Sequence, residues 1–280
     1  MGTFESQNIE TPEYIRTKTS ENLKEKTPQI KNKWVYLTIP IVSIALGELM
    51  IFSGRKLEAM VIYALIMLGL SFSMIYIKNK EIQKTYQALI LLPILRLVDF
   101  SMPLFYEEKL YNLIFTYCLL AISVSIAAMN QGFTSTQLGI TFKKIGRYIP
   151  LSILMGLLLG VGEYIIVGKN PLIEDFSIFN LLSLTIIMVF FVSPVEEMIF
   201  RSILQNRLEI VLGSWKALLI TSILFGLMHS GYGSIYEIFY ISLVGVFIGY
   251  LFHGTRSLPL VTLIHGFMNV FFFGVIPLLL

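Results

Sequence analysis

Cysteine, charge and histidine are all scarce in this chain of 280 residues. The single cysteine, Cys118, excludes an intrachain disulfide framework and a metal site built from several cysteines. Charged residues make up only 14% of the chain, hydrophobic residues make up 55%, and the mean hydropathy is +0.75. This composition lies outside the range of soluble domains. The sequence therefore predicts a polytopic membrane protein.

Apolar stretches of spanning length recur along the whole chain. About 20 apolar residues are needed to cross the hydrocarbon layer of a bilayer, so the sequence predicts an all-α bundle of about eight to nine membrane helices. The candidate spans lie near residues 34–54, 58–77, 87–105, 110–129, 148–168, 179–200, 215–229, 235–252 and 259–279.

Lysine and arginine are distributed unevenly between the loops that join these spans. With the N-terminus in the cytoplasm, 16 of the 21 basic residues fall on the cytoplasmic side, six of them before residue 34. Basic residues favour cytoplasmic loops, so we expect this orientation. The net charge of +3 then reflects membrane topology, and nothing indicates nucleic-acid binding.

The chain divides into three predicted parts. Residues 1–33 are polar and predict a cytoplasmic tail, residues 34–129 hold N-terminal transmembrane helices, and residues 130–280 form a second membrane domain. The segment 137–147 mixes apolar and basic residues, which predicts a short helix along the inner interface.

Small and charged residues within the spans predict particular contacts. Gly156 and Gly160 would let another helix approach closely. Arg96 and Asp99 lie one helical turn apart and can neutralise each other within the bundle. Glu48 and Glu163 are single buried acids for which the sequence indicates no partner.

Two adjacent carboxylates, Glu196 and Glu197, stand in an apolar stretch with Arg201 four residues on. One charge at membrane depth costs roughly 2.5 to 3.5 kcal/mol on insertion scales, so such a pair points to a chemical role. Glu197 and Arg201 are i,i+4 neighbours, which predicts an ion pair. Glu196 points about 100° away around the helix and stays available as a general base.

Ser193 and Pro194 offer a second interpretation of the same stretch. Ser193 as an N-cap, Pro194 at the first position and Glu196 closing a capping box would describe the start of a helix. That interpretation leaves Glu197 unexplained.

All three histidines lie in the C-terminal third of the chain. Phe225 and His229 are four residues apart, as are His265 and Asn269, so each pair shares one helix face. Each polar residue could also simply hydrogen-bond a neighbouring membrane helix. His253 is expected at the inner membrane boundary, outside any site.

A helical hairpin that turns at Gly213 would bring Glu196 and His229 to the same level, roughly 24 Å from the turn. The polar tip of this hairpin would project about 12 Å into the cytoplasm. Glu196 and His229 would then lie at a depth in the membrane similar to the roughly 10 Å expected for His265. We therefore expect a polar cavity that opens to the cytoplasmic side.

The four polar residues Glu196, His229, His265 and Asn269 suggest two mechanisms of hydrolysis. In one, Glu196 with His229 deprotonates a water that attacks a peptide carbonyl, while His265 and Asn269 donate hydrogen bonds to the oxyanion. In the other, Glu196, His229 and His265 bind zinc and leave a position open for water. The first makes better use of Asn269, because a neutral amide suits an oxyanion and is an unusual zinc ligand.

The order of these motifs on separate spans, Glu-Glu-xxx-Arg, Phe-xxx-His and His-xxx-Asn, resembles the CAAX protease and bacteriocin-processing family of intramembrane proteases (CPBP, or Abi). The resemblance covers about residues 130–280. It implies a membrane-embedded endopeptidase similar to the Ras-converting CAAX endopeptidases. Family members have been described both as metalloproteases and as metal-independent glutamate proteases. The roles that it implies are water activation by Glu196 with His229, an oxyanion site at His265 and Asn269, and support from Glu197, Arg201 and Phe225.

Three classes of function follow from these patterns. The leading one is an endopeptidase for a membrane-associated, and on the resemblance prenylated, peptide substrate, with no required cofactor and a divalent metal such as zinc as the alternative. The second is a non-catalytic membrane protein, such as a bacteriocin-immunity or regulatory scaffold. The third is a proton-coupled transporter, disfavoured by the lack of a detectable inverted repeat. Short loops favour a prokaryotic cell membrane.

Overall fold

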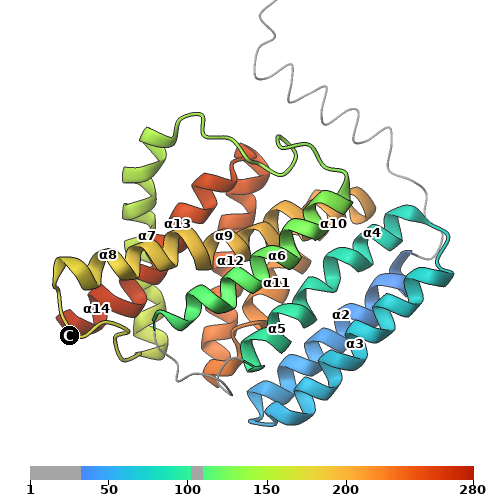
Figure 1. Cartoon of the computed structure of the whole chain (residues 1–280), viewed down its shortest axis with the longest axis horizontal. Helices are drawn as coiled ribbons and strands as arrows, with labels where there is room; N and C mark the ends of the chain where they lie inside the picture. Colours follow the sequence, from blue (N-terminus) through green and yellow to red (C-terminus); the bar gives the residue numbers. More distant parts are fainter. Residues whose placement is uncertain (1–32, 102–109) are drawn as a thin grey trace, which may run out of the picture.

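The structure is a computed structural model of the chain that describes residues 33–101 and 110–280. Apart from Lys33, the predicted cytoplasmic tail lies outside the described residues. Every regular element in the described ranges is a helix (Figure 1). The predicted all-α fold is therefore confirmed.

Seven helices of the described residues are long and apolar enough to cross a membrane, as expected of a polytopic integral membrane protein. They are α2 (Lys33–Phe52), α3 (Lys56–Tyr76), α6 (Asn112–Gln131), α7 (Ile145–Val167), the continuous helix Ile178–Leu212, α12 (Ile235–Thr255) and the continuous helix Leu258–Leu279. The two other expected spans form shorter helices of the bundle. The span expected near 87–105 falls on the end of α4 (Lys80–Leu89) and on α5 (Leu91–Ser101), and the span expected near 215–229 falls on α11 (Ser214–Leu227).

The helix Ile178–Leu212 runs without a break through the Glu196 region. It consists of α8 (Ile178–Ile187), α9 (Ser193–Glu197) and α10 (Asn206–Leu212), joined by the π-helical segments η2 (Met188–Val192) and η3 (Met198–Gln205). Ser193 has helical angles, φ −62° and ψ −37°, and its N–H bonds to the Met188 carbonyl five residues back. The interpretation of Ser193 as a helix start is therefore wrong. The widened π turn just before Pro194 accommodates a residue that cannot continue the regular hydrogen-bond ladder.

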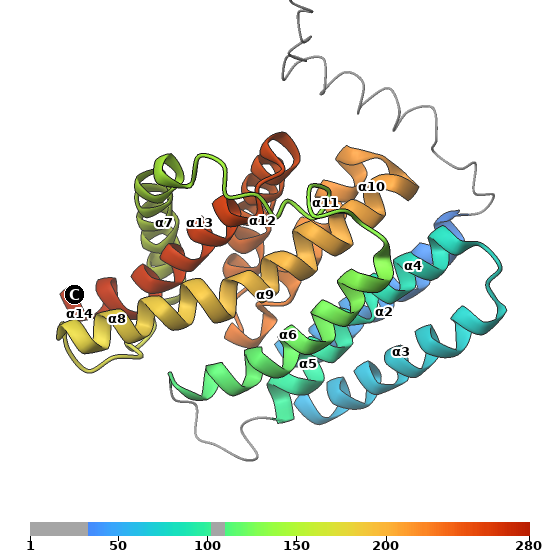
Figure 2. The same cartoon turned by 45° about the horizontal axis from the view of Figure 1, so that its top comes forward.

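Gly213 makes the predicted hairpin turn between α10 and α11. Its φ of 86° lies in the region that favours glycine. Figures 1 and 2 show the Ile178–Leu212 helix crossing the molecule, with α2 to α6 on one side and α7, α12 and α13 (Leu258–Val270) on the other. The helix that carries Glu196 is thus central to the bundle.

Gly156 and Gly160 let α7 and α13 approach closely, as predicted. A Cβ at Gly156 would lie 2.6 Å from the Cβ of Phe267, and one at Gly160 would lie 2.9 Å from the Met268 carbonyl oxygen. Because His265 lies on α13, this contact also sets the position of a predicted site residue.

The short interfacial helix expected over residues 137–147 is absent, since turns occupy this segment until α7 begins at Ile145. Gly139 has a φ of 76° and its carbonyl accepts a 2.8 Å hydrogen bond from the N–H of Leu258. A left-handed glycine tied to the start of α13 is incompatible with a continuous helix.

Candidate active site

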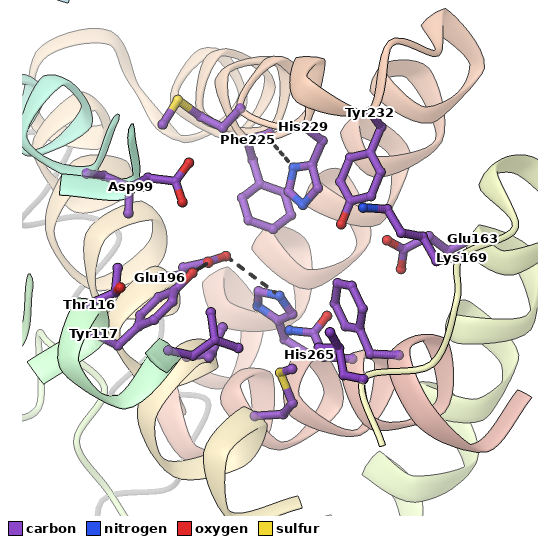
Figure 3. A pocket seen from close by; sticks show the side chains of 18 of the residues that line it. Asp99, Thr116, Tyr117, Glu163, Lys169, Glu196, Phe225, His229, Tyr232 and His265 are labelled. Carbon is purple, nitrogen blue, oxygen red and sulfur yellow. Dashed lines mark hydrogen bonds and ion pairs between the residues drawn. The ribbon is translucent and has the colours of Figure 1, made fainter. Parts of the chain in front are cut away.

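The four predicted catalytic residues line one cavity of about 330 Å³ (Figure 3). They come from different parts of the chain: Glu196 from α9, His229 from the turn after α11, and His265 and Asn269 from α13. Phe225 also lines the cavity. The structure therefore brings these residues together, and their chemical roles remain predictions.

Glu197 connects Arg201 to His265 beneath the cavity. The Arg201 Nε donates to one carboxylate oxygen of Glu197 at 3.1 Å, as expected for the i,i+4 pair. The other oxygen lies 2.8 Å from Nδ1 of His265. Because a carboxylate only accepts, Nδ1 of His265 carries the hydrogen. Glu197 and Arg201 are both fully buried, so this chain is a rigid support for the imidazole.

Phe225 packs between the charged support and the two histidines. The guanidinium Cζ of Arg201 lies 4.9 Å from the centre of the Phe225 ring. The two Nη atoms of Arg201 have no hydrogen-bond partner among the described residues, so the face of the Phe225 ring provides their electrostatic contact. The same ring meets His229 at 5.2 Å and His265 at 5.6 Å between centroids, each edge to face.

Glu196 contacts two side chains within the cavity. One oxygen accepts a hydrogen bond from the hydroxyl of Tyr117 on α6. The other lies 3.8 Å from Nε2 of His265. Sequence reasoning missed Tyr117, since a tyrosine in an apolar span is also typical of a membrane interface and no spacing links it to Glu196.

His229 presents a hydrogen-bond acceptor to the cavity. Its Nδ1 lies 3.0 Å from the carbonyl oxygen of Phe225, one turn earlier. A carbonyl accepts only, so Nδ1 carries the hydrogen and Nε2 of the neutral ring has a free lone pair. Figure 3 shows His229 and His265 on opposite sides of the cavity, with Glu196 reaching in from a third.

Two residues of the N-terminal half hold the segment around His229. Arg96 on α5 forms two 2.7 Å hydrogen bonds with Glu48 on α2. Arg96 also donates to the carbonyl of Met228, and Glu48 accepts from the Ser230 hydroxyl. The predicted contact of Arg96 with Asp99 is present at 3.4 Å, but Glu48 is the closer partner. Met228 and Ser230, the residues on either side of His229, are thus held in place by these hydrogen bonds.

A second polar group on the cavity wall was not predicted as part of the site. Glu163 on α7 lines the cavity and is only 3% exposed, and the carboxyl group of Glu237 on α12 lies close to it. Nearby, Nζ of Lys169 lies 4.4 Å from the ring centre of Tyr232. These residues lie on α7, on α12 and in the segments next to them, so no local spacing indicates that they meet.

The zinc alternative would need Glu196, His229 and His265 as ligands. Within residues 33–101 and 110–280, no three His, Cys, Asp or Glu residues are arranged to hold a metal ion. Nε2 of His265 lies 3.8 Å from one oxygen of Glu196, and the other oxygen of Glu196 is bound to Tyr117. No step of the mechanism below is therefore derived through a metal.

The exposed part of the cavity wall lies near the ends of α5 and α7. The exposed residues among its lining are Lys169 and Asn170, and the Asp99 side chain is 55% exposed. Phe200 and Phe225 also line the cavity, and both rings are nearly fully buried. The expectation that the cavity opens to the cytoplasmic side stays a prediction.

Comparison with known families agrees with the motifs. Residues 178–271 match the family model described as Type II CAAX prenyl endopeptidase Rce1-like. No curated protein and no solved structure matches the chain. The matched segment includes every residue on which the resemblance was based, from Glu196 to Asn269. The resemblance to the CAAX protease and bacteriocin-processing family is thus confirmed over residues 178–271, which are similar to the Rce1-like type II CAAX prenyl endopeptidases.

Proposed function

We propose that this protein is an intramembrane endopeptidase that hydrolyses a peptide bond of a membrane-associated substrate with a water activated by Glu196. One observation carries the proposal. Glu197, paired with Arg201, holds His265 so that its Nε2 lies 3.8 Å from Glu196 in an enclosed cavity. The similarity of residues 178–271 to an endopeptidase family supports the same chemistry.

Glu196 and His229 act on the attacking water. A water between them donates one hydrogen to the Glu196 carboxylate and the other to the free Nε2 of His229, which orients its oxygen lone pair. As that oxygen bonds to the peptide carbonyl carbon, Glu196 takes the proton. General-base catalysis of this kind contributes typically about 10²- to 10⁴-fold in rate.

Asn269 and His265 act on the oxyanion. The Asn269 amide donates a hydrogen bond to it, and His265 in its protonated form donates from Nε2 while Glu197 balances its charge. Losing one such donor costs about 10²- to 10³-fold in rate. Glu196 then returns its proton to the amine nitrogen as the C–N bond breaks. The products are a carboxylic acid and an amine, and the carboxylate is regenerated.

Peptide cleavage by the purified full chain in detergent tests the proposal. A prenylated C-terminal peptide and the same peptide without the lipid are the first substrates, because the matched family is named for prenyl endopeptidases. Glu196→Gln and His229→Ala are expected to abolish cleavage. His253→Ala is the matched control, since His253 contacts Glu209 and does not line the cavity. Cleavage that survives both site changes would contradict the assignment.

Metal dependence is tested on the same preparation. We expect full activity after exhaustive chelation, since Glu196 is the proposed base. Loss of activity that zinc restores would overturn this mechanism in favour of the metal alternative.

A further inference from the structure

We infer that Glu163, backed by Glu237, forms with the ring of Tyr232 a binding site for a positively charged side chain, a lysine or an arginine of the peptide that enters the cavity. That this peptide is a substrate rests on the proposed function. The cation site itself rests on the burial, charge and geometry of the described residues.

Two carboxyl groups lie close together beside the cavity. Glu163 on α7 is 3% exposed and lines the cavity, and Glu237 in the first turn of α12 is fully buried. Oε2 of Glu163 and both carboxyl oxygens of Glu237 have no hydrogen-bond partner among the described residues. Burying a carboxyl group without a partner destabilises a fold, so this pair requires an explanation other than packing.

The position of Glu237 at the start of a helix does not explain its carboxyl group. Ser234 is the N-cap of α12, and its hydroxyl oxygen accepts a 3.3 Å hydrogen bond from the N–H of Glu237. In a complete capping box the glutamate side chain also returns to the backbone N–H of the N-cap residue. The carboxyl oxygens of Glu237 make no such bond within the described part of the chain. The negative charge of this group is therefore not used by the helix itself.

An ammonium group of the chain itself already lies next to this pair. Nζ of Lys169 is 4.4 Å from the centre of the Tyr232 ring. Figure 3 shows Lys169, Tyr232 and Glu163 on the wall across the cavity from Glu196. The face of a tyrosine ring attracts such a cation. Because Lys169 is exposed and belongs to the segment after α7, a cation of the substrate can displace it from the ring.

The chemistry of the site selects an organic cation. A carboxylate accepts strong hydrogen bonds from an ammonium or guanidinium group, and an aromatic face binds the same groups. A divalent metal ion such as Ca²⁺ takes several oxygen ligands. Among residues 33–101 and 110–280, no three His, Cys, Asp or Glu residues are arranged to hold a metal ion. A lysine or arginine side chain therefore fits this site better than a metal ion does.

The cation site shares the cavity with the proposed reaction centre. Glu163 and Tyr232 line the same cavity of about 330 Å³ as Glu196 and His229. The ring of Tyr232 is nearly parallel to that of His229, with 6.1 Å between the ring centroids. A cavity of this volume holds only a short stretch of peptide, so the basic residue would lie close in sequence to the cleaved bond. Glu163 would thus determine specificity and take no part in breaking the bond.

Binding of matched peptides to the purified full chain in detergent tests the inference. The probes are short fluorescent peptides of alanine and leucine with one lysine at successive positions, and the same peptides with uncharged norleucine in place of the lysine. Fluorescence anisotropy is measured for the parent chain and for Glu163→Gln, Lys169→Gln and Glu174→Gln, with detergent alone as the blank. Glu174 is the matched control, because it also follows α7, is exposed and does not line the cavity.

We expect the parent chain to bind the lysine peptide about tenfold or more tightly than the norleucine peptide at one lysine position at least, as a hydrogen bond to a charged group allows. Glu163→Gln should remove this preference without weakening the binding of the norleucine peptide, and Glu174→Gln should leave the preference unchanged. Lys169→Gln should increase the preference, because it removes the competing cation. Since Lys169 is exposed, this variant tests the site without disturbing the buried pair.

Equal binding of both peptides by the parent chain would overturn the inference. A Lys169→Gln variant with a lower preference for lysine would do so too, as would a Glu163→Gln variant that weakens both peptides equally at an unchanged melting temperature. If Glu163→Gln lowers the melting temperature, the Lys169→Gln result decides. Binding needs no cleavage, so a chain that prefers lysine but cleaves no peptide would refute the protease proposal alone. A chain that cleaves lysine and norleucine peptides with equal KM would refute the inference alone.

Discussion

Arg96 binds Glu48 through two hydrogen bonds of 2.7 Å and also donates to the carbonyl of Met228, the residue before His229. Glu48 in turn accepts from Ser230, the residue after it. The N-terminal helices therefore position a residue of the proposed site, although the family match begins only at residue 178.

The losses of stability on removing Glu48 and on removing Arg96 should not be additive. Glu48→Gln or Arg96→Met leaves a buried group unpaired, which typically costs about 3 to 5 kcal/mol of stability. The double variant removes both charges and should lose less than the sum of the two single losses. Thermal unfolding in detergent measures this coupling.

The exposed pair Arg55 and Glu58 is the control for this cycle. Their side chains are 57% and 48% exposed, so the same changes there should leave the melting temperature unchanged. Equal effects at both pairs would contradict a structural role specific to Glu48 and Arg96.

Glu196→Gln and Glu197→Gln should fail in different ways. Glu196→Gln removes the proposed base and should lower kcat by about 10²-fold or more while the fold remains intact. Glu197→Gln leaves the buried Arg201 without its counter-ion and should lower stability by about 3 kcal/mol or more as well as activity. Activity and melting temperature measured side by side separate the two roles. Identical profiles would contradict the distinction.

Gly156→Ala should displace α13 and with it His265. The new Cβ would lie 2.6 Å from Phe267 Cβ and 2.8 Å from the Met268 backbone nitrogen, and backbone atoms cannot simply move aside. Overpacking of this kind costs typically about 1 to 3 kcal/mol. Gly69→Ala on α3 is the control, because nothing lies within 4 Å of its Cβ position. A melting temperature lowered equally by both changes would indicate that close packing is not the cause.

Tyr117→Phe should reduce catalysis with little effect on folding. The change removes the hydroxyl that donates to Glu196, so the carboxylate loses its orientation. A single hydrogen bond to a charged group is worth about 1.5 to 3 kcal/mol, which corresponds to a fall in kcat of about tenfold or more. Tyr111→Phe, an exposed tyrosine one residue before the same helix, should leave kcat unchanged. A change in KM alone at Tyr117 would instead indicate a substrate contact.

Local geometry explains which features could be predicted from the sequence. The Glu197 and Arg201 pair follows from i,i+4 spacing, and the Gly213 turn follows from a polar stretch that ends in a glycine. The Ser193 and Pro194 interpretation was wrong, because packing around the central helix keeps it continuous through a π turn. The preference of Ser193 and Pro194 for the start of a helix was outweighed by the packing of the surrounding helices.

Contacts between distant segments could not be predicted in this way. Tyr117 reaches Glu196 across 79 positions, and Arg96 reaches Met228 across 132. No helical period relates such residues, since their meeting depends on how separate spans pack.

The sequence by itself determined a helical membrane protein with a chemically distinctive C-terminal third, because apolar length and i,i+4 spacing are local properties of a helix. Tertiary structure alone decided that His265 contacts Glu197 as well as Glu196, and that Tyr117 and the Glu48 and Arg96 pair support the cavity. These features depend on the relative depth and rotation of helices from separate spans, which packing sets after each helix has formed.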